Sequence, residues 1–67
     1  MSQVKEVITA KANQSARTFT IRKYVGDKLI AKYRTIRMSI DDFESCENNT
    51  ENDWRQFLKS DDYYPVN

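Results

Sequence analysis

The pattern of apolar and polar positions changes near residue 38. Before that point the two kinds of residue alternate, which is typical of strands that lie with one face on a core. Residues 4–12 show this alternation, with Ile8 on the inner face and Lys5 and Lys11 on the other. They therefore predict a first strand with one basic face.

A β-hairpin is predicted next, from two runs rich in β-branched and aromatic residues. The runs are residues 18–25 and 29–36, on either side of Gly26-Asp27. A loop with an odd number of residues, with Val25 opposite Leu29, also places Ile21 opposite Tyr33. A shift by one residue would place charged side chains opposite the apolar ones on the inner face, because it turns every side chain of one strand to the other face. The predicted inner face holds Phe19, Ile21, Val25, Leu29, Ala31 and Tyr33.

Beyond residue 38 the spacing of apolar residues becomes that of short amphipathic helices. Ser39 followed by Asp42, and Thr50 followed by Asp53, are typical of helix N-caps with an acidic residue at the third position. Apolar residues then recur at intervals of three and four, which places them on one face of each helix. The expected core side chains from this region are Ile40, Phe43, Trp54, Phe57 and Leu58.

The helical stripes need an apolar surface, and the inner face of the predicted sheet provides one. We therefore expect an α+β fold, a three-stranded antiparallel β-meander followed by two short α-helices packed on one face of the sheet. One small domain then spans residues 1–67, with strands at about 4–37, helices at about 39–60 and a tail at 61–67. Pro65 argues against a central strand in the tail, which we expect to lie along a sheet edge or to stay loose.

Charge is sorted along the chain in the same two parts. Residues 1–38 carry nine basic and two acidic side chains, a net charge of +7, whereas residues 39–67 carry two basic and eight acidic ones, a net charge of −6. The total of +1 therefore hides two surfaces of opposite sign. Their complementarity, together with the small core that this length allows, leaves self-association, head-to-tail or as a symmetric homodimer, as a structural alternative.

Basic side chains gather on the face of the predicted sheet that the helices leave uncovered. If the first strand pairs beside the hairpin, this face carries Lys5, Lys11, Arg22, Tyr24, Lys32 and Arg34. Such a face suits an anionic partner such as DNA or RNA, because cations neutralise phosphates and a tyrosine stacks on a base. The alternative is an ordinary solvated face, since the uncovered side of an antiparallel sheet is polar in any case.

Acidic side chains gather on the predicted helices and in the tail, where two adjacent tyrosines follow them. The candidate surface for a protein partner consists of Asp41, Asp42, Glu44, Asp61, Asp62, Tyr63 and Tyr64. Tyrosine is enriched at interface hot spots, and dense negative charge can imitate a phosphate backbone. The alternative for the acidic residues is a solvated face with favourable pairing to the helix dipoles.

The residue types that perform most catalysis are scarce. The chain has no histidine, the commonest general base, and a single glycine, which excludes a phosphate-cradling loop. Cys46 is the only cysteine and has acidic neighbours that raise the pKa of a thiol, so we expect a small core residue. We expect no enzyme, no metal and no cofactor. No signal peptide or apolar run of ~20 residues is recognisable, which favours the cytoplasm.

In size and style the chain resembles small phage-encoded accessory proteins. The resemblance rests on the segments 28–35, 39–43 and 50–58, the last leading into Tyr63-Tyr64. It implies a non-enzymatic inhibitor or modulator in the host cytoplasm, which occupies a site on a defence factor, nuclease, polymerase subunit or toxin. The alternative from the residues themselves is a regulator that binds DNA or RNA directly through the basic face of the sheet.

Overall fold

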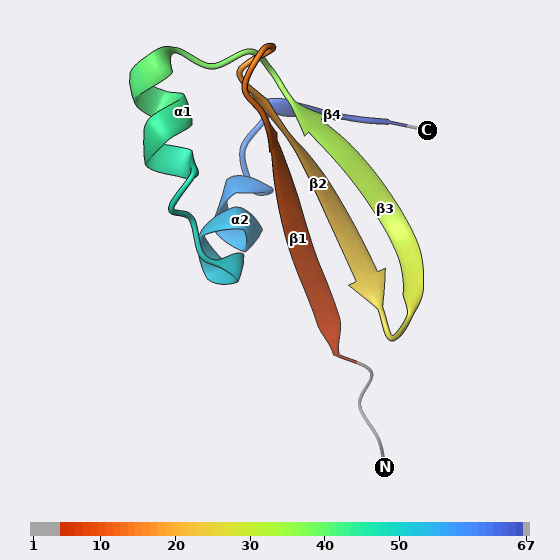
Figure 1. Ribbon diagram of the computed structural model, residues 1–67. Helices are drawn as coiled ribbons and strands as arrows, with labels where there is room; N and C mark the ends of the chain where they lie inside the picture. Colours follow the sequence, from red (N-terminus) through yellow and green to blue (C-terminus); the bar gives the residue numbers. More distant parts are fainter. Residues whose placement is uncertain (1–4, 67) are drawn as a thin grey trace.

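A computed structural model describes residues 5–66, in which a four-stranded sheet carries two helices on one side (Figure 1). The elements are β1 (Glu6–Asn13), β2 (Thr18–Val25), β3 (Lys28–Thr35), α1 (Ile40–Cys46), α2 (Glu51–Phe57) and β4 (Tyr63–Pro65). The strands follow the order β1-β2-β3-β4 and every neighbouring pair is antiparallel. The α+β class and the meander are confirmed. Val4 and Asn67, at the ends of the expected elements, lie outside the described residues.

The number of strands differs from the prediction, because the tail forms a fourth strand. In β4, Tyr63 pairs with Thr35 and Pro65 pairs with Tyr33. The amide of Val66 then donates a hydrogen bond of 2.9 Å to the carbonyl of Lys32. A proline is compatible with this place because β4 is an edge strand and one of its sides needs no N–H donors. The segment is too short to show the alternation that reveals a strand.

The predicted hairpin register is right in the body of the hairpin and wrong near its turn. Ile21 pairs with Tyr33 as predicted, but Val25 pairs with Lys28 and not with Leu29. Gly26 has a φ of 63°, at the first central position of a two-residue turn, where a type II′ hairpin turn requires a glycine.

A β-bulge separates the two registers of the hairpin, one in its body and one near its turn. The register shifts between Lys23 and Tyr24, and Ile30 is the extra residue on β3. The shift pairs Leu29 with Tyr24, on the opposite face from Ile21. Leu29, predicted to lie on the inner face, is therefore 45% exposed.

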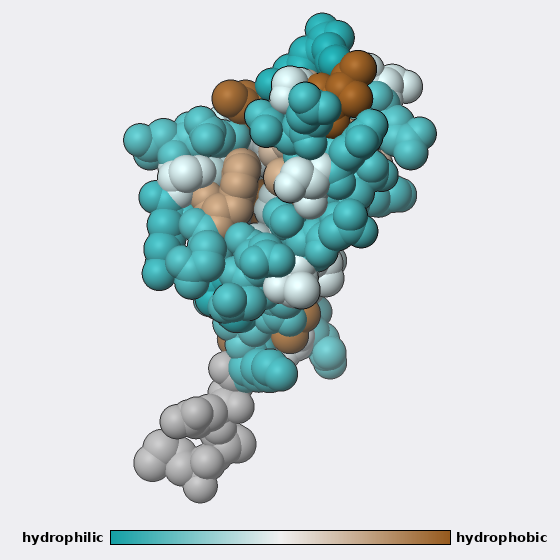
Figure 2. All heavy atoms as spheres, turned by 90° about the vertical axis from the view of Figure 1, so that its left-hand side faces the viewer, coloured by the Kyte–Doolittle hydropathy of each residue, from teal (hydrophilic) through white to brown (hydrophobic). Residues whose placement is uncertain are grey.

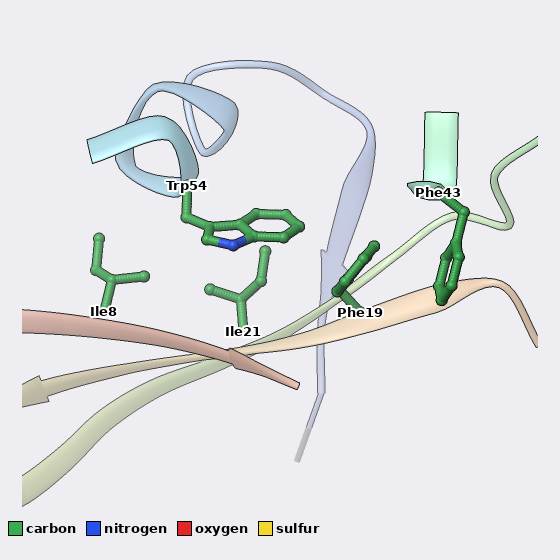
Figure 3. Packing of buried hydrophobic residues seen from close by; sticks show 5 residues of the cluster. All are labelled: Ile8, Phe19, Ile21, Phe43 and Trp54. Atoms are coloured by element: carbon green, nitrogen blue, oxygen red, sulfur yellow. The ribbon is translucent and has the colours of Figure 1, made fainter. Parts of the chain in front are cut away.

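The core lies between the sheet and the helices, and Val25, also predicted for the inner face, is half-buried at the end of β2 and outside the core cluster. Ile8, Phe19 and Ile21 come from the sheet, and Phe43 and Trp54 come from α1 and α2. The ring of Trp54 lies over Ile8 and Ile21, while Phe19 stands between Trp54 and Phe43 (Figure 3). The Phe19 ring centroid is 4.8 Å from that of Phe43 and 4.9 Å from that of Trp54. Ile21 has no exposed surface.

Both helices begin at the predicted caps. The Oγ of Ser39 accepts a hydrogen bond of 3.2 Å from the amide of Asp42. Thr50 and Asp53 form a full capping box, in which each side chain accepts a hydrogen bond from the other residue's amide. Helices of seven residues are unstable alone, so the caps define where each helix begins and the core contacts hold it in place.

One predicted core residue, Ile40, is 59% exposed. It is the first residue of α1, whose single buried side chain is that of Phe43. Because α1 has only two turns and meets the core at Phe43, its first residue extends beyond the packed surface. Phe57 and Leu58, from the other predicted stripe, are half-buried and pack against the core.

Removing one methylene group from the core measures how closely it is packed. We expect Ile21→Val to lower the free energy of unfolding by about 0.5–1.5 kcal/mol, because the lost methylene leaves a cavity under Trp54. The matched control Ile36→Val changes a side chain that is 50% exposed, and we expect a change within about 0.5 kcal/mol. Urea denaturation followed by the fluorescence of Trp54, the single tryptophan, measures both values. Equal effects would contradict the packing.

Candidate functional site

The side of the sheet turned away from the helices, here called the outer face, brings the predicted basic residues together. Side chains alternate along a strand, so the residues adjacent to buried Ile8 and Ile21 point outward. The pairing of β1 with β2 and of β2 with β3 aligns these outward positions. The outer-face positions with a basic or aromatic side chain are Lys11, Arg22, Tyr24, Lys32, Arg34 and Tyr64. Lys5, also predicted for this site, is exposed just before β1.

Two neighbouring rows across the strands contain most of this positive charge. In the first row, Thr9 pairs with Arg22, which pairs with Lys32. In the second row, Lys11 pairs with Thr20, and Thr20 pairs with Arg34. The pairings therefore bring Lys11, Arg22, Lys32 and Arg34 together as the sequence predicted, whereas Lys5 precedes β1 and lies outside these rows.

Arg22 and Lys32 are direct cross-strand partners, which places two positive charges opposite each other. Side chains in such a pair have Cβ atoms roughly 5 Å apart, and like charges there destabilise a sheet. Within residues 5–66, the ion pairs join Lys23 to Glu6 and Arg55 to Glu51. None involves an outer-face cation, and no acidic residue occupies an outer-face position of β1 to β4. The repulsion is therefore not relieved within the described part of the chain.

Two tyrosines lie on the outer face with these cations. Tyr24 is half-buried between Val7 and Leu29, its partners in the neighbouring strands. Tyr64 pairs with Arg34 and is 46% exposed. The sequence assigned Tyr64 to a different surface, because the pairing of β4 was not predicted. Tyr64 therefore extends the second basic row, and Tyr24 lies in the next row beyond Arg22 and Lys32.

Tyr63 does not share a surface with Tyr64, although the sequence grouped them. Successive residues of β4 point to opposite faces, so the Tyr63 ring lies on the helix side. Its centroid is 5.0 Å from that of Tyr33, and its hydroxyl donates a hydrogen bond of 2.6 Å to the carbonyl of Leu58. Tyr63 therefore packs the end of the sheet against the segment after α2.

The acidic residues predicted for the protein-partner surface lie on two different segments of the molecule. All five are exposed, three on α1 (Asp41, Asp42, Glu44) and two in the segment before β4 (Asp61, Asp62). Asp42 and Asp62 line the same groove, here called the helix-side groove, and the other three do not line it. In the part of the chain that the structure describes, no group of acidic or thiol side chains is arranged to hold a metal ion.

The helix-side groove has a volume of about 380 Å³ and was not predicted from the sequence. Met38, Cys46 and Phe57 give it an apolar floor, because each lines it and packs against the core. The hydrophobic residues in this hollow are bordered by hydrophilic ones (Figure 2). Partial burial raises the pKa of the Cys46 thiol and Asp42 raises it further, against a lowering hydrogen bond from Asn49. The thiol therefore stays protonated near neutral pH, in agreement with the direction predicted.

Comparison with protein-family models, curated proteins and solved structures finds no match for this chain. No helix among residues 5–66 is long and apolar enough to cross a membrane. The candidate site therefore rests on its own geometry. A sheet face with four cations and two tyrosines can neutralise phosphates and stack on bases.

A double-mutant cycle measures the repulsion between Arg22 and Lys32. We expect Arg22→Glu and Lys32→Glu each to raise the free energy of unfolding by about 0.2–1 kcal/mol, because each creates a cross-strand ion pair. The double variant restores two like charges, so its stability should fall well short of the sum of the single effects. Urea denaturation at low and high salt tests this, since salt screens the coupling. Additive effects would show that the two charges do not interact.

Proposed function

We propose that this chain is a non-enzymatic binding protein whose outer face binds single-stranded DNA or RNA. The observation that supports this most strongly is the direct opposition of Arg22 and Lys32, with Arg34 one row away. Holding like charges together costs stability, and a polyanionic ligand removes that cost by supplying the missing negative charge. A face that was merely solvated would be served as well by side chains of mixed sign.

A single strand fits this face better than a duplex does. Stacking on Tyr24 and Tyr64 requires bases whose flat faces are accessible, which a duplex does not offer. Reading a duplex requires a helix or a two-stranded ribbon inserted into a groove. Here the cations instead lie in rows across the strands, with the tyrosines in the neighbouring positions.

An inhibitor that occupies a protein site is the other function inferred from the sequence. That hypothesis joined the acidic residues with Tyr63 and Tyr64 into one surface, whereas these residues lie on different sides of the molecule. Nucleic-acid binding needs only residues that already share one face, so we rank it first.

Fluorescence anisotropy with labelled single-stranded and duplex oligonucleotides tests the proposal. If about four phosphates are neutralised, the affinity for a single strand should fall about 50-fold between 50 mM and 200 mM salt. Arg22→Glu/Lys32→Glu should abolish binding, because two attractive charges become repulsive. The control Lys28→Glu/Lys59→Glu changes the net charge equally away from the basic rows, and should retain most of the affinity. Equal losses in both variants, or no binding at low salt, would overturn the proposal.

The tyrosines provide a second, charge-independent test. We expect Tyr24→Ala and Tyr64→Ala each to weaken single-strand binding at least about fivefold, because each removes a stacking surface worth about 1–3 kcal/mol. Tyr24→Phe and Tyr64→Phe keep the ring and should bind nearly as well as the natural chain. The same anisotropy titration measures all four variants. Unchanged affinity in both alanine variants would leave only electrostatic contacts and refute the stacking role.

A further inference from the structure

The helix-side groove has the features of a site for an apolar side chain. Its floor consists of Met38, Cys46 and Phe57, and Ile36, which is 50% exposed, stands beside them. An exposed isoleucine next to an apolar hollow extends the surface that a ligand can cover. The volume of about 380 Å³ lies near the lower end for ligand pockets, which suits one or two inserted side chains.

Hydrogen bonds hold the groove open without a ligand. The amide of Ile36 donates to the carbonyl of Asp62 at 3.0 Å, which ties the segment after β3 to the segment before β4. The amide of Met38 donates to the carbonyl of Arg17 at 2.9 Å. Arg17 has a φ of 53°, a conformation that is costly for a residue other than glycine. The hydrogen bond from Met38 is one of the contacts that keep Arg17 in this conformation. Because the walls of the groove are already ordered, less conformational entropy is lost when a ligand binds.

The charge around the groove selects the kind of partner. Asp42 and Asp62 line it against a single basic lining residue, Arg37. Both aspartates belong to residues 39–67, which have a net charge of −6. A nucleic acid is repelled here, whereas a lysine or arginine beside an apolar anchor gains favourable contacts.

We propose that the helix-side groove binds a segment of a partner protein in which an apolar side chain is flanked by basic residues. The apolar side chain inserts over Met38, Cys46 and Phe57, and the basic residues lie against Asp42 and Asp62. This surface is on the opposite side of the sheet from the outer face, so the inference does not depend on nucleic-acid binding. Together the two surfaces give the protein separate sites for a polyanion and for a basic protein segment.

An array of short synthetic peptides tests the proposal on the full chain. Each peptide carries a central leucine, methionine or phenylalanine flanked by lysine, serine or glutamate, and a matched set has serine at the centre. We expect selective binding of the peptides that combine the apolar centre with lysine. These peptides should also slow the alkylation of Cys46, the only cysteine, because the occupied groove covers it. Binding that ignores the central residue or the flanking charge, or no binding, would overturn the proposal.

Matched variants locate the binding. Asp42→Asn/Asp62→Asn removes two charges that line the groove, and we expect at least a tenfold loss of affinity. Asp41→Asn/Glu44→Gln removes two charges outside the groove and should change affinity less than threefold. Ser45→Trp places a large side chain at the groove lining and should block binding. Thermal unfolding confirms that each variant is folded, and equal effects of the two neutralised pairs would contradict the site.

Two further measurements separate the possible occupants. Arg22→Glu/Lys32→Glu should bind the peptides as the natural chain does, even where it no longer binds an oligonucleotide. Sedimentation at the concentration of the peptide experiment should show a monomer. A dimer that Ser45→Trp dissociates would mean that a second copy occupies the groove and would overturn the partner-protein proposal.

Discussion

The contact of Trp54 with the inner face of β1 and β2 is the interaction on which the rest of the structure depends. A short antiparallel sheet is stable only when one face is covered, and neither seven-residue helix is stable without that surface. The indole covers Ile8 and Ile21, and Phe19 joins it to Phe43 on the other helix (Figure 3). This packing decides which face of the sheet is closed and which remains available to a ligand.

The character of the outer face follows from the same packing, because side chains alternate strictly along a strand. Once Ile21 points inward, Arg22 must point outward, and antiparallel pairing then places Lys32 directly opposite. The β-bulge is essential to this arrangement. It allows a tight turn at Gly26 and still returns the hairpin to the register that buries Ile21 beside Tyr33. The core and the basic surface therefore depend on one register, and neither can change without the other.

Much of the fold, and the basic part of the candidate site, could be predicted from the sequence because both depend on local periodicity. The alternation around Ile21 and the caps at Ser39 and Thr50 are such local patterns. The remainder depends on tertiary contacts. Whether Tyr64 reaches the outer face depends on the pairing of a three-residue strand, and the helix-side groove forms only where segments distant in sequence meet. The position of Leu29 depends on a turn geometry that the apolar pattern does not specify.

The separation of charge between the two sides of the molecule also explains how a nearly neutral chain can present two strongly charged surfaces of opposite sign. Acidic side chains reduce the attraction of a polyanion to Arg22 and Lys32 only when they lie within a Debye length, about 8 Å at physiological salt. The helices lie behind the sheet, so the sheet itself separates their exposed acidic side chains from the outer face. Most of the acidic charge on the helices is therefore screened from a ligand on the outer face, and the outer-face cations are screened from a ligand in the groove. Each ligand then responds mainly to the charge of its own side, and the net charge of +1 describes neither surface.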